Sequence, residues 1–421
     1  MRLSNQKFIG ILIPITMLIY NINWKIGAIL GVFVILCILM SGRGKINLKN
    51  SVICWSWAIY IFLFAVILQF LRSYDFTVSY VVGYILSAFI LFMGLSSIST
   101  NKIISTFKIL ALFEALGVLL QVFFPSLYSF IIGIIVSPAT KQSILSRVTE
   151  GYYTGFSREA SLTVIFLILG IGILSIDFLY NKGLYNFKQK RKLFLQLILL
   201  IVALLFTGKK AQPIFCLFAL MITYFVYSNK KLKIIKISGA IFLLILLIVI
   251  AYPYIQNIPS LARYTSLIDS IRQQQNIAIV TSGRTEIYET AIDLWKKDRF
   301  WGIGWNNFKN SVSSTAWFYR FDVHNCYLQV LCETGYIGAI PYYILMIITF
   351  GRTIYSASFR RKLYTQVDSK IAFSIYYFSF FLFYGITGTC LYELSYYIPF
   401  FISIIWCEQE IKNCKLKIVN E

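Results

Sequence analysis

The sequence has few charged residues for its length. Only 13% of its 421 residues are Asp, Glu, Lys or Arg, whereas 58% are hydrophobic. A soluble globular domain carries about 25% charged residues, so this composition excludes a water-soluble enzyme with a polar surface on all sides. The aromatic content of 17% excludes a disordered chain. The composition therefore indicates a polytopic membrane protein whose apolar side chains face lipid.

The sequence also lacks the common motifs that bind metals or nucleotides. Its single histidine and eight cysteines form no Cys-x-x-Cys pair and no His/Cys cluster. We expect no metal site, and we interpret the cysteines as small buried hydrophobic residues; a redox pair of Cys326 and Cys332 is the alternative. Walker, Asp-x-Asp and Gly-x-Ser-x-Gly motifs are missing, and Gly302-Ile303-Gly304 lacks the third glycine of a dinucleotide loop. We therefore expect no cofactor and no reaction driven by a cytoplasmic nucleotide.

Long apolar segments divide the chain. A spanning helix needs about 20 mostly apolar residues, so we predict an all-α polytopic protein, with residues 1–421 forming a single integral membrane domain. About twelve spans are predicted, at 8–22, 25–40, 51–71, 76–98, 103–124, 159–180, 193–206, 211–228, 237–255, 324–350, 371–389 and 391–407. The first apolar run has no cleavage site of the signal-peptide type, so we expect it to remain as a helix.

Lys and Arg residues gather in every second loop between these spans, for example in 43–49, 182–192, 230–236 and 352–370. Because cytoplasmic loops carry an excess of these residues, we predict that both termini are cytoplasmic. The net charge of +22 reflects these scattered clusters. They contain no recognition motif, so we expect no nucleic-acid partner.

Two longer segments are predicted to lie outside the membrane, at 125–158 and at 256–323. The second connects the ninth and tenth predicted spans. Within it, Ile287, Ala291 and Leu294 recur at helical spacing, while charged residues occupy the other faces. This pattern predicts an amphipathic helix that lies on the outer membrane surface or covers a cavity.

Ionisable residues gather at four places on the predicted outer side. Such groups are costly near membrane depth, which makes them candidates for function. They are Arg158 and Glu159 at the start of the sixth span, Lys209 and Lys210 between the seventh and eighth, Arg284 at the start of the amphipathic helix, and His324 with Asn325 at the tenth.

Each place has a structural alternative. Glu159 beside a helix start stabilises the helix dipole, and the two lysines fit a plain exposed turn. The functional interpretation is that the cations bind an anion such as a lipid-linked diphosphate. His324 could take a proton from a sugar hydroxyl or, when protonated, bind diphosphate. Glu333, further along the tenth span, is a candidate for lining the same cavity.

Five motifs occur in a fixed order along the chain. They are Gly-Phe-x-x-Glu-x-Ser at 155–161, Thr-Gly followed by lysines at 207–210, Ser-Gly-Arg-x-x-x-Tyr at 282–288, Gly-Ile-Gly-Trp-Asn-Asn-Phe at 302–308 and His-Asn-x-Tyr-Leu-Gln-x-Leu-x-Glu-x-Gly-Tyr-Ile-Gly at 324–338. Together they resemble the O-antigen polymerase/ligase superfamily. This superfamily includes Wzy-type polysaccharide polymerases and ligases that transfer polysaccharide from undecaprenyl diphosphate to the lipid A core. The last motif is the most specific.

The resemblance implies a metal-independent, inverting glycosyltransferase of the GT-C-like class in the bacterial cytoplasmic membrane, with its active site facing outside. Its donor would be an undecaprenyl diphosphate-linked oligosaccharide held among membrane lipid, and a chain-length regulator is a typical partner. We expect a polymerase of O-antigen, capsule or exopolysaccharide. A ligase with a different acceptor and a lipid-linked oligosaccharide flippase are the alternatives.

The resemblance also implies roles for individual residues. Arg284 would contact the diphosphate, and His324 would contact it or help to activate the acceptor. Lys209 and Lys210 occupy the turn where the family usually has an arginine, which leaves open which lysine acts. Glu159 matches the glutamate of many polymerase-like members and is a candidate for acceptor binding or base catalysis.

Overall fold

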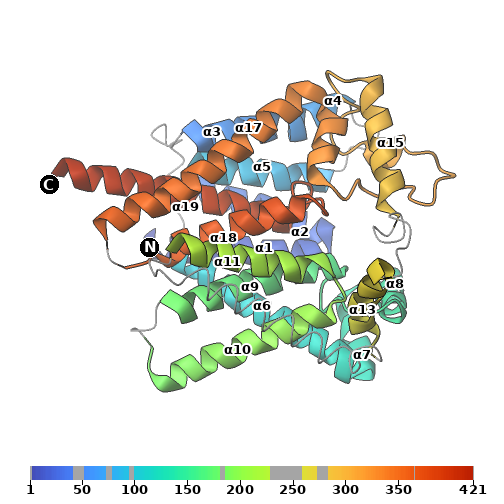
Figure 1. Cartoon of the computed structure of the whole chain (residues 1–421), viewed down its shortest axis with the longest axis horizontal. Helices are drawn as coiled ribbons and strands as arrows, with labels where there is room; N and C mark the ends of the chain where they lie inside the picture. Colours follow the sequence, from blue (N-terminus) through green and yellow to red (C-terminus); the bar gives the residue numbers. More distant parts are fainter. Residues whose placement is uncertain are drawn as a thin grey trace.

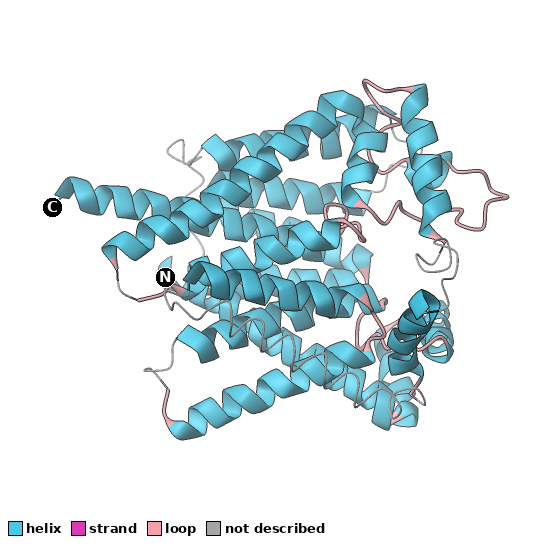
Figure 2. Ribbon diagram, viewed as in Figure 1, coloured by secondary structure: helices cyan, strands magenta, loops and turns pink. Residues whose placement is uncertain are grey.

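The computed structural model describes residues 2–40, 52–72, 78–93, 99–180, 185–227, 258–272, 283–364 and 366–420. Within these ranges every regular element is a helix and no strand occurs (Figure 2). The elements are α1 (Arg2–Ile22), α2 (Trp24–Ile38), α3 (Val52–Tyr60), the π-helix η2 (Ile61–Leu68), α4 (Gln69–Arg72), α5 (Val78–Met93), α6 (Thr100–Phe123), α7 (Pro125–Ile135), α8 (Pro138–Thr149), α9 (Ala160–Tyr180), α10 (Phe187–Phe206), α11 (Ala211–Tyr227), α13 (Pro259–Arg272), α15 (Arg284–Lys297), α16 (Phe308–Ser311), α17 (Cys326–Leu363), α18 (Ser369–Gly385) and α19 (Leu394–Asn420).

Four helical segments are long and apolar enough to cross a membrane: Val52–Leu71, Thr100–Phe123, Ala160–Tyr180 and Cys326–Leu363. Shorter apolar helices include α2, α11 and most of α1. A helix is present at each predicted span that falls mainly within the described residues, whereas the span predicted at 237–255 lies outside them. The structure thus has the all-helical form of a polytopic membrane protein, and the number of twelve spans stays a prediction.

Two helices form the centre of the bundle. Residues Ile371–Phe381 of α18 and most of α9 are buried on all sides, as expected for helices that are hydrophobic around their whole circumference. α18 packs against α9, α11, α17 and α19. This arrangement brings the residues before α9 and after α18 together at one end of the bundle.

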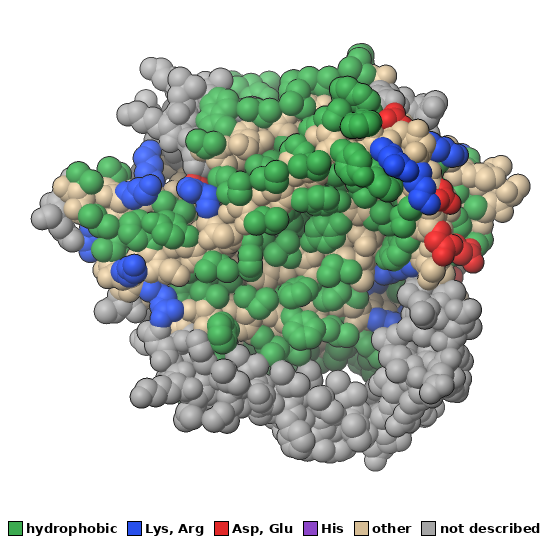
Figure 3. Space-filling view, turned by 45° about the horizontal axis from the view of Figure 1, so that its top comes forward, with side chains coloured by type: hydrophobic (Ala, Val, Ile, Leu, Met, Phe, Trp, Pro, Cys, Tyr) green, Lys and Arg blue, Asp and Glu red, His purple; other side chains and the backbone are tan. Residues whose placement is uncertain are grey.

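The bundle has two distinct ends and an apolar belt. In Figure 1, α7, α8, α13 and α15 lie at one end, and α19 ends at the opposite one, where α1 begins. The face in Figure 3 is hydrophobic across its middle and carries Lys and Arg toward both ends. Exposed side chains such as Ile29, Phe70 and Ile347 are apolar. Such a surface suits contact with lipid tails.

The segments predicted as outer loops contain helices. Residues 125–158 include α7 and α8, each with proline in its first turn, where the missing N–H is tolerated. The longer segment contains α13 and α15, while 256–257 and 273–282, with Ser282, lie outside the described residues. The predicted amphipathic helix corresponds to α15, whose Ile287, Ala291 and Leu294 are buried.

Helix α17 is interrupted at Gly335, where φ is 57° and ψ is −161°. A Cβ atom there would lie 2.3 Å from the carbonyl oxygen of Phe300, so only glycine fits. On either side of this break the main chain of α17 pairs with the preceding loop. Tyr336 N–H donates to Arg299 O at 2.8 Å, and Ile303 N–H donates to Cys332 O at 3.1 Å. The loop before α17 is therefore fixed to the helix by backbone contacts.

All eight cysteines are free thiols. Seven of them are buried and Cys37 is partly exposed. Cys326 and Cys332, the alternative redox pair, are both buried and not joined. The cysteines thus have the environment of small hydrophobic residues.

Candidate functional site

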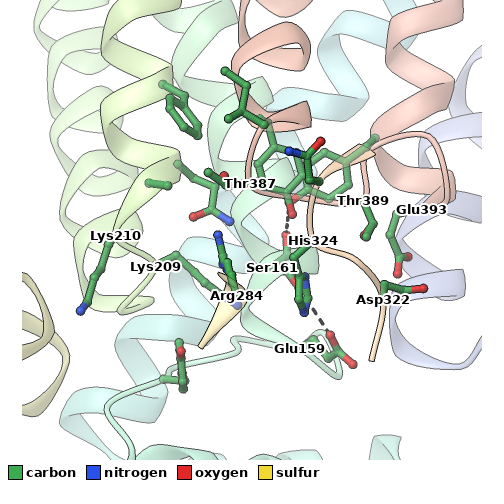
Figure 4. Close-up of a pocket in the computed structure, with 18 of the residues that line it drawn as sticks. Glu159, Ser161, Lys209, Lys210, Arg284, Asp322, His324, Thr387, Thr389 and Glu393 are labelled. Carbon is green, nitrogen blue, oxygen red and sulfur yellow. Dashed lines mark hydrogen bonds between the residues drawn. The ribbon is translucent and has the colours of Figure 1, made fainter. Parts of the chain in front are cut away.

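A cavity of about 890 Å³ lies at the end of the bundle that carries α13 and α15. Its lining comes from segments far apart in the sequence (Figure 4). Of the residues singled out from the sequence, it contains Arg158, Glu159, Lys209, Lys210, Arg284, His324 and Asn325. The structure therefore brings the four polar places together around one space.

The turn before α9 is held from α6. The buried Glu114 carboxylate accepts hydrogen bonds from Phe156 N–H at 3.0 Å and from the Ser157 hydroxyl at 2.7 Å. Gln121 accepts from Thr154 N–H at 2.8 Å. Buried polar groups require such partners, and here the partners are the otherwise unbonded donors of a turn. α6 thereby fixes the backbone from which the next two residues project.

Those two residues, Arg158 and Glu159, meet different neighbours. The Arg158 N–H donates to Asn21 O at 3.1 Å, which ties the turn to the end of α1. The Glu159 carboxylate lies 4.0 Å from the Arg147 guanidinium and accepts a 3.4 Å hydrogen bond from the Ser161 hydroxyl. Glu159 therefore already has partners at the edge of the cavity.

The lysine turn is held by α13. Arg263 donates to Gly208 O at 3.1 Å, and the Tyr264 hydroxyl donates to Lys209 O at 2.8 Å. The Arg263 guanidinium also lies 3.8 Å from the centre of the Tyr152 ring, and the Lys209 ammonium lies 5.0 Å from the same ring. Cation–π contacts of this kind stabilise positive charge away from water.

The charge of Lys209 is easily lost in this environment. Burial lowers the pKa of Lys209 to about 8; the charge of Glu159 opposes this, while Arg284 and Arg263 add to the lowering. The pKa of Lys210 is lowered by burial and then by Arg263. Several cations close together raise the energy of each charged form, and a bound anion would relieve that repulsion.

Arg284 reaches the cavity from the middle of the long predicted loop, and His324 reaches it from just after the end of that loop. Arg284 opens α15, whose N-terminal backbone N–H groups favour an anion. His324 has a positive φ of 55°, which is uncommon for a residue other than glycine. It precedes Asn325, whose side chain caps α17 by accepting from Leu328 N–H at 3.0 Å. The Tyr288 hydroxyl donates to His324 O at 3.4 Å.

The surroundings of His324 favour the neutral form of its imidazole. Burial and then the Arg284 charge lower the pKa of His324; Asp322 acts in the opposite direction, and Lys209 lowers it further. A neutral imidazole has one nitrogen that can accept a hydrogen bond or a proton.

Glu333 does not line this cavity. Its carboxylate accepts from Asn306 N–H at 2.6 Å, Phe308 N–H at 3.1 Å and the Gln329 amide at 3.2 Å. The same Gln329 amide donates to Asp322 at 3.2 Å. The carboxylate of Glu333 is thus used by the turn at the start of α16. Glu333 thus holds the turn, as Glu114 holds the turn before α9.

Some lining residues were not predicted as site residues: Tyr152, Arg263, Lys309, Arg320, Asp322 and Glu393. Arg263 could have been suspected from its place in the long loop, although no motif marks it. Glu393 stands near the start of the last predicted span. It therefore meets the same criterion, a charge near membrane depth, that selected Glu159.

Comparison with known families gives the identity of this arrangement. Residues 195–343 match the model of a family described as O-antigen ligase. The match places residues 195–343, less than half of the chain, in the O-antigen polymerase/ligase superfamily. The resemblance seen in the sequence is confirmed for this region. The matched region contains Lys209, Lys210, Arg284 and His324, whereas Arg158 and Glu393 lie outside it. No curated protein matches the chain.

The family match supports O-antigen ligase- or polymerase-type activity. It also supports a membrane glycosyltransferase-like enzyme with a lipid-linked glycan as substrate. The apolar helices and the family match agree with an integral bacterial membrane protein.

Proposed function

We propose that the protein is a polysaccharide polymerase that joins undecaprenyl diphosphate-linked repeat units on the outer face of the bacterial cytoplasmic membrane. The observation that carries this proposal is the convergence of Lys209, Lys210 and Arg284 with His324 around one cavity of about 890 Å³. The sequence contains no nucleotide-binding motif, in keeping with a donor that carries no nucleotide. The enzyme would be a GT-C-like glycosyltransferase that needs no metal.

The cations explain how the leaving group departs. A diphosphate that leaves the anomeric carbon gains negative charge, and cations already in place stabilise the transition state. Arg284 offers a planar pair of donors beside the N-terminus of α15, and Lys209 adds a charge from the α10–α11 turn. Arg158 also lines the cavity and is a further candidate.

His324 stands in position to assist the acceptor. In one displacement, the acceptor oxygen bonds to the anomeric carbon as the bond to the diphosphate breaks, and the electron pair leaves with the diphosphate. The anomeric configuration inverts. The acceptor proton passes to a base, for which neutral His324 or Glu159 is the candidate from the family motifs. Asn325 holds the start of α17 so that His324 keeps its place.

The arrangement of the bundle fits this topology. α1 begins and α19 ends at the end opposite α13 and α15 (Figure 1). With both termini in the cytoplasm, as the loop charges predict, the cavity faces outside. The apolar sides of the bundle would hold the polyprenyl chain among membrane lipid. A chain-length regulator is the protein partner we expect.

A ligase is the second candidate, and a specific observation favours it: the matching family model is described as O-antigen ligase. A ligase would use the same lipid diphosphate donor and the same cations. It would pass the finished glycan to a different acceptor instead of extending it.

Product analysis in a deletion strain tests the proposal. The lipid-linked glycans would be extracted and the surface polysaccharide sized by gel electrophoresis, with complementation by wild-type and His324→Ala proteins. Lost polymer with accumulated single repeat units supports the polymerase. Intact lipid-linked polymer that fails to reach its final acceptor identifies the ligase, and repeat units retained on the cytoplasmic face would overturn both in favour of a flippase.

A further inference from the structure

The labelled charges of the cavity are unevenly placed. In Figure 4, Lys209, Lys210 and Arg284 lie on one side, Asp322 and Glu393 lie on the other, and His324 stands between them. Arg158 and Lys309 also line the cavity and act on Glu393, so the second side carries charges of both signs. Its carboxylates can accept hydrogen bonds and therefore suit a part of the substrates that donates them.

Glu393 has an unused acceptor on that side. It directly precedes α19, and its Oε2 atom is buried and accepts no hydrogen bond within the described part of the chain. Thr387, in the same α18–α19 connection, also has a buried hydroxyl without a partner there. Both residues line the cavity. A buried polar atom without a partner is unfavourable, so a ligand that supplies hydroxyl groups would stabilise both.

Glu393 also differs from Glu159 in its surroundings. Glu159 is near the Arg147 guanidinium and accepts from the Ser161 hydroxyl. Within the described residues, the Oε2 atom of Glu393 has no such partner. Among neighbouring charges, Arg158 acts most strongly on Glu393, while Glu159 and Asp322 oppose its charged form. A carboxylate with a free acceptor atom can receive a proton from a hydroxyl group that binds to it.

We propose that Glu393 and Asp322 form the subsite for the acceptor sugar, and that Glu393 receives the proton of the attacking hydroxyl. This inference rests on the proposed function and names its acceptor side. The acceptor O–H bond breaks and its proton goes to the Glu393 carboxylate. The freed electron pair forms the bond to the anomeric carbon, and the carbon–oxygen bond to the diphosphate breaks with its electrons going to the diphosphate. That group stays on the side of Lys209 and Arg284.

The family resemblance gives His324 two possible roles, activation of the acceptor or contact with the diphosphate. With Glu393 as the base, His324 takes the second role. His324 lies between the two sides, and the Arg284 charge acts on it directly. Asp322 has one oxygen engaged by the Gln329 amide at 3.2 Å, which orients its carboxylate. Asp322 would therefore position the sugar, whereas Glu393 would take the proton.

A structural role for Glu393 makes a different prediction. A carboxylate before the first turn of α19 favours the helix dipole, and its loss would lower stability without a selective effect on transfer. Glu393→Gln keeps the size of the side chain and can still accept a hydrogen bond, but it cannot serve as the base. Glu289→Gln, on the exposed face of α15, is the matched control.

The experiment uses the purified full-length protein in detergent or vesicles. Repeat units linked to lipid, extracted from a strain that lacks the protein, serve as donor and acceptor, and undecaprenyl diphosphate alone is the probe of the cationic side. Single-turnover sugar transfer, binding of the probe and thermal unfolding are measured for the wild type, Glu393→Gln, Glu393→Asp and the control. We expect Glu393→Gln to bind the probe like the control, whereas its transfer rate falls by about 100-fold or more and Glu393→Asp restores part of it.

The outcomes separate the inference from the proposed function. Transfer by Glu393→Gln within about threefold of the control would overturn the base role. A parallel loss of probe binding, transfer and thermal stability would assign Glu393 to the fold and also overturn it. A wild-type protein that binds the probe but transfers no sugar to any lipid-linked acceptor would instead overturn the proposed function.

Discussion

The end of the bundle where α19 terminates and the end that holds the cavity use charge differently. At the first, Arg352 and Arg360 are paired with carboxylates. Arg352 forms a two-point pair with Glu408, and Arg360 contacts Asp368 at 3.6 Å and also Glu410. These pairs connect α17 to α19 and to the start of α18, so their charges are used within the protein.

At the cavity end, by contrast, the cations face an open space. Within the described part of the chain, neither Lys209 nor Arg284 lies within 4 Å of a carboxylate. Both line the cavity. Keeping such charges close together is unfavourable for stability, and that cost is typical of functional sites. The comparison teaches that Arg352 and Arg360 join helices through ion pairs, whereas Lys209 and Arg284 line a cavity that a ligand could occupy.

The strongest test of this comparison is Arg284→Ala. Removing one preorganised donor from a transition state typically lowers the rate by about 100-fold or more, so we expect polymer to be lost while single lipid-linked repeat units accumulate. Arg299→Ala, which removes an exposed arginine outside the cavity, should leave polymer unchanged. Normal polymer length and yield from well-expressed Arg284→Ala protein would show that Arg284 is not needed for transfer. The proposed functional difference between the two ends of the bundle would then be wrong.

Glu333→Gln tests a buried carboxylate near the cavity that serves the fold. One of its oxygens becomes an NH₂ group facing backbone donors, so we expect a loss of about 1–3 kcal/mol in the free energy of unfolding. Thermal or chemical unfolding in detergent measures it, with Glu289→Gln as the control. An unchanged free energy of unfolding combined with a selective loss of sugar transfer would show that Glu333 takes part in the reaction and does not serve the fold.

Arg352→Ala tests the opposite end. It leaves Glu408, whose side chain is 6% exposed, without its arginine, while Arg352 itself is 38% exposed. We expect the free energy of unfolding to fall by about 1–2 kcal/mol, less than for a fully buried pair. Sugar transfer per folded molecule should match the wild type. A reduced transfer rate at unchanged stability would show that the two ends are coupled.

The smallest expected effect is a change in pH dependence. Because the pKa of Lys209 is lowered to about 8, the residue is charged below that pH and loses its charge as the pH rises through it. Transfer should therefore decline above about pH 8, and Lys209→Arg should move that decline to higher pH because arginine stays protonated. Rates measured from about pH 6 to pH 10 decide this, and an identical alkaline limb in both proteins would contradict a role for the Lys209 charge.

Much of the fold could be predicted because lipid imposes strict requirements on helix length and polarity. The helices found at 160–180 and 326–363 correspond to apolar runs that the sequence shows plainly. α7 and α8 were missed because they are short and because α8 is too polar to resemble a span. Their helical form depends on packing at the end of the bundle.

Site residues could be predicted where a charged residue stands near membrane depth. The prediction missed residues that only the packing of distant helices brings to the cavity. His324 and Lys209 were found because such residues are unusual at those places. Arg263 was missed because nothing in the sequence states that α13 lies beside the lysine turn. Glu393 was missed although it stands near membrane depth, as Glu159 does, because no motif marks it. Glu333 was predicted to line the cavity because it lies on the same helix as the residues after His324. Its side chain instead accepts hydrogen bonds from a neighbouring turn.

The joining of α17 to its preceding loop has a consequence for how such proteins diversify. The contacts between Tyr336 and Arg299 and between Ile303 and Cys332 involve main-chain atoms, so they are indifferent to most side chains. Gly335 is the exception, because any Cβ there would strike the loop. Side chains between Arg299 and Gly304 can therefore change while the backbone path of this loop stays the same.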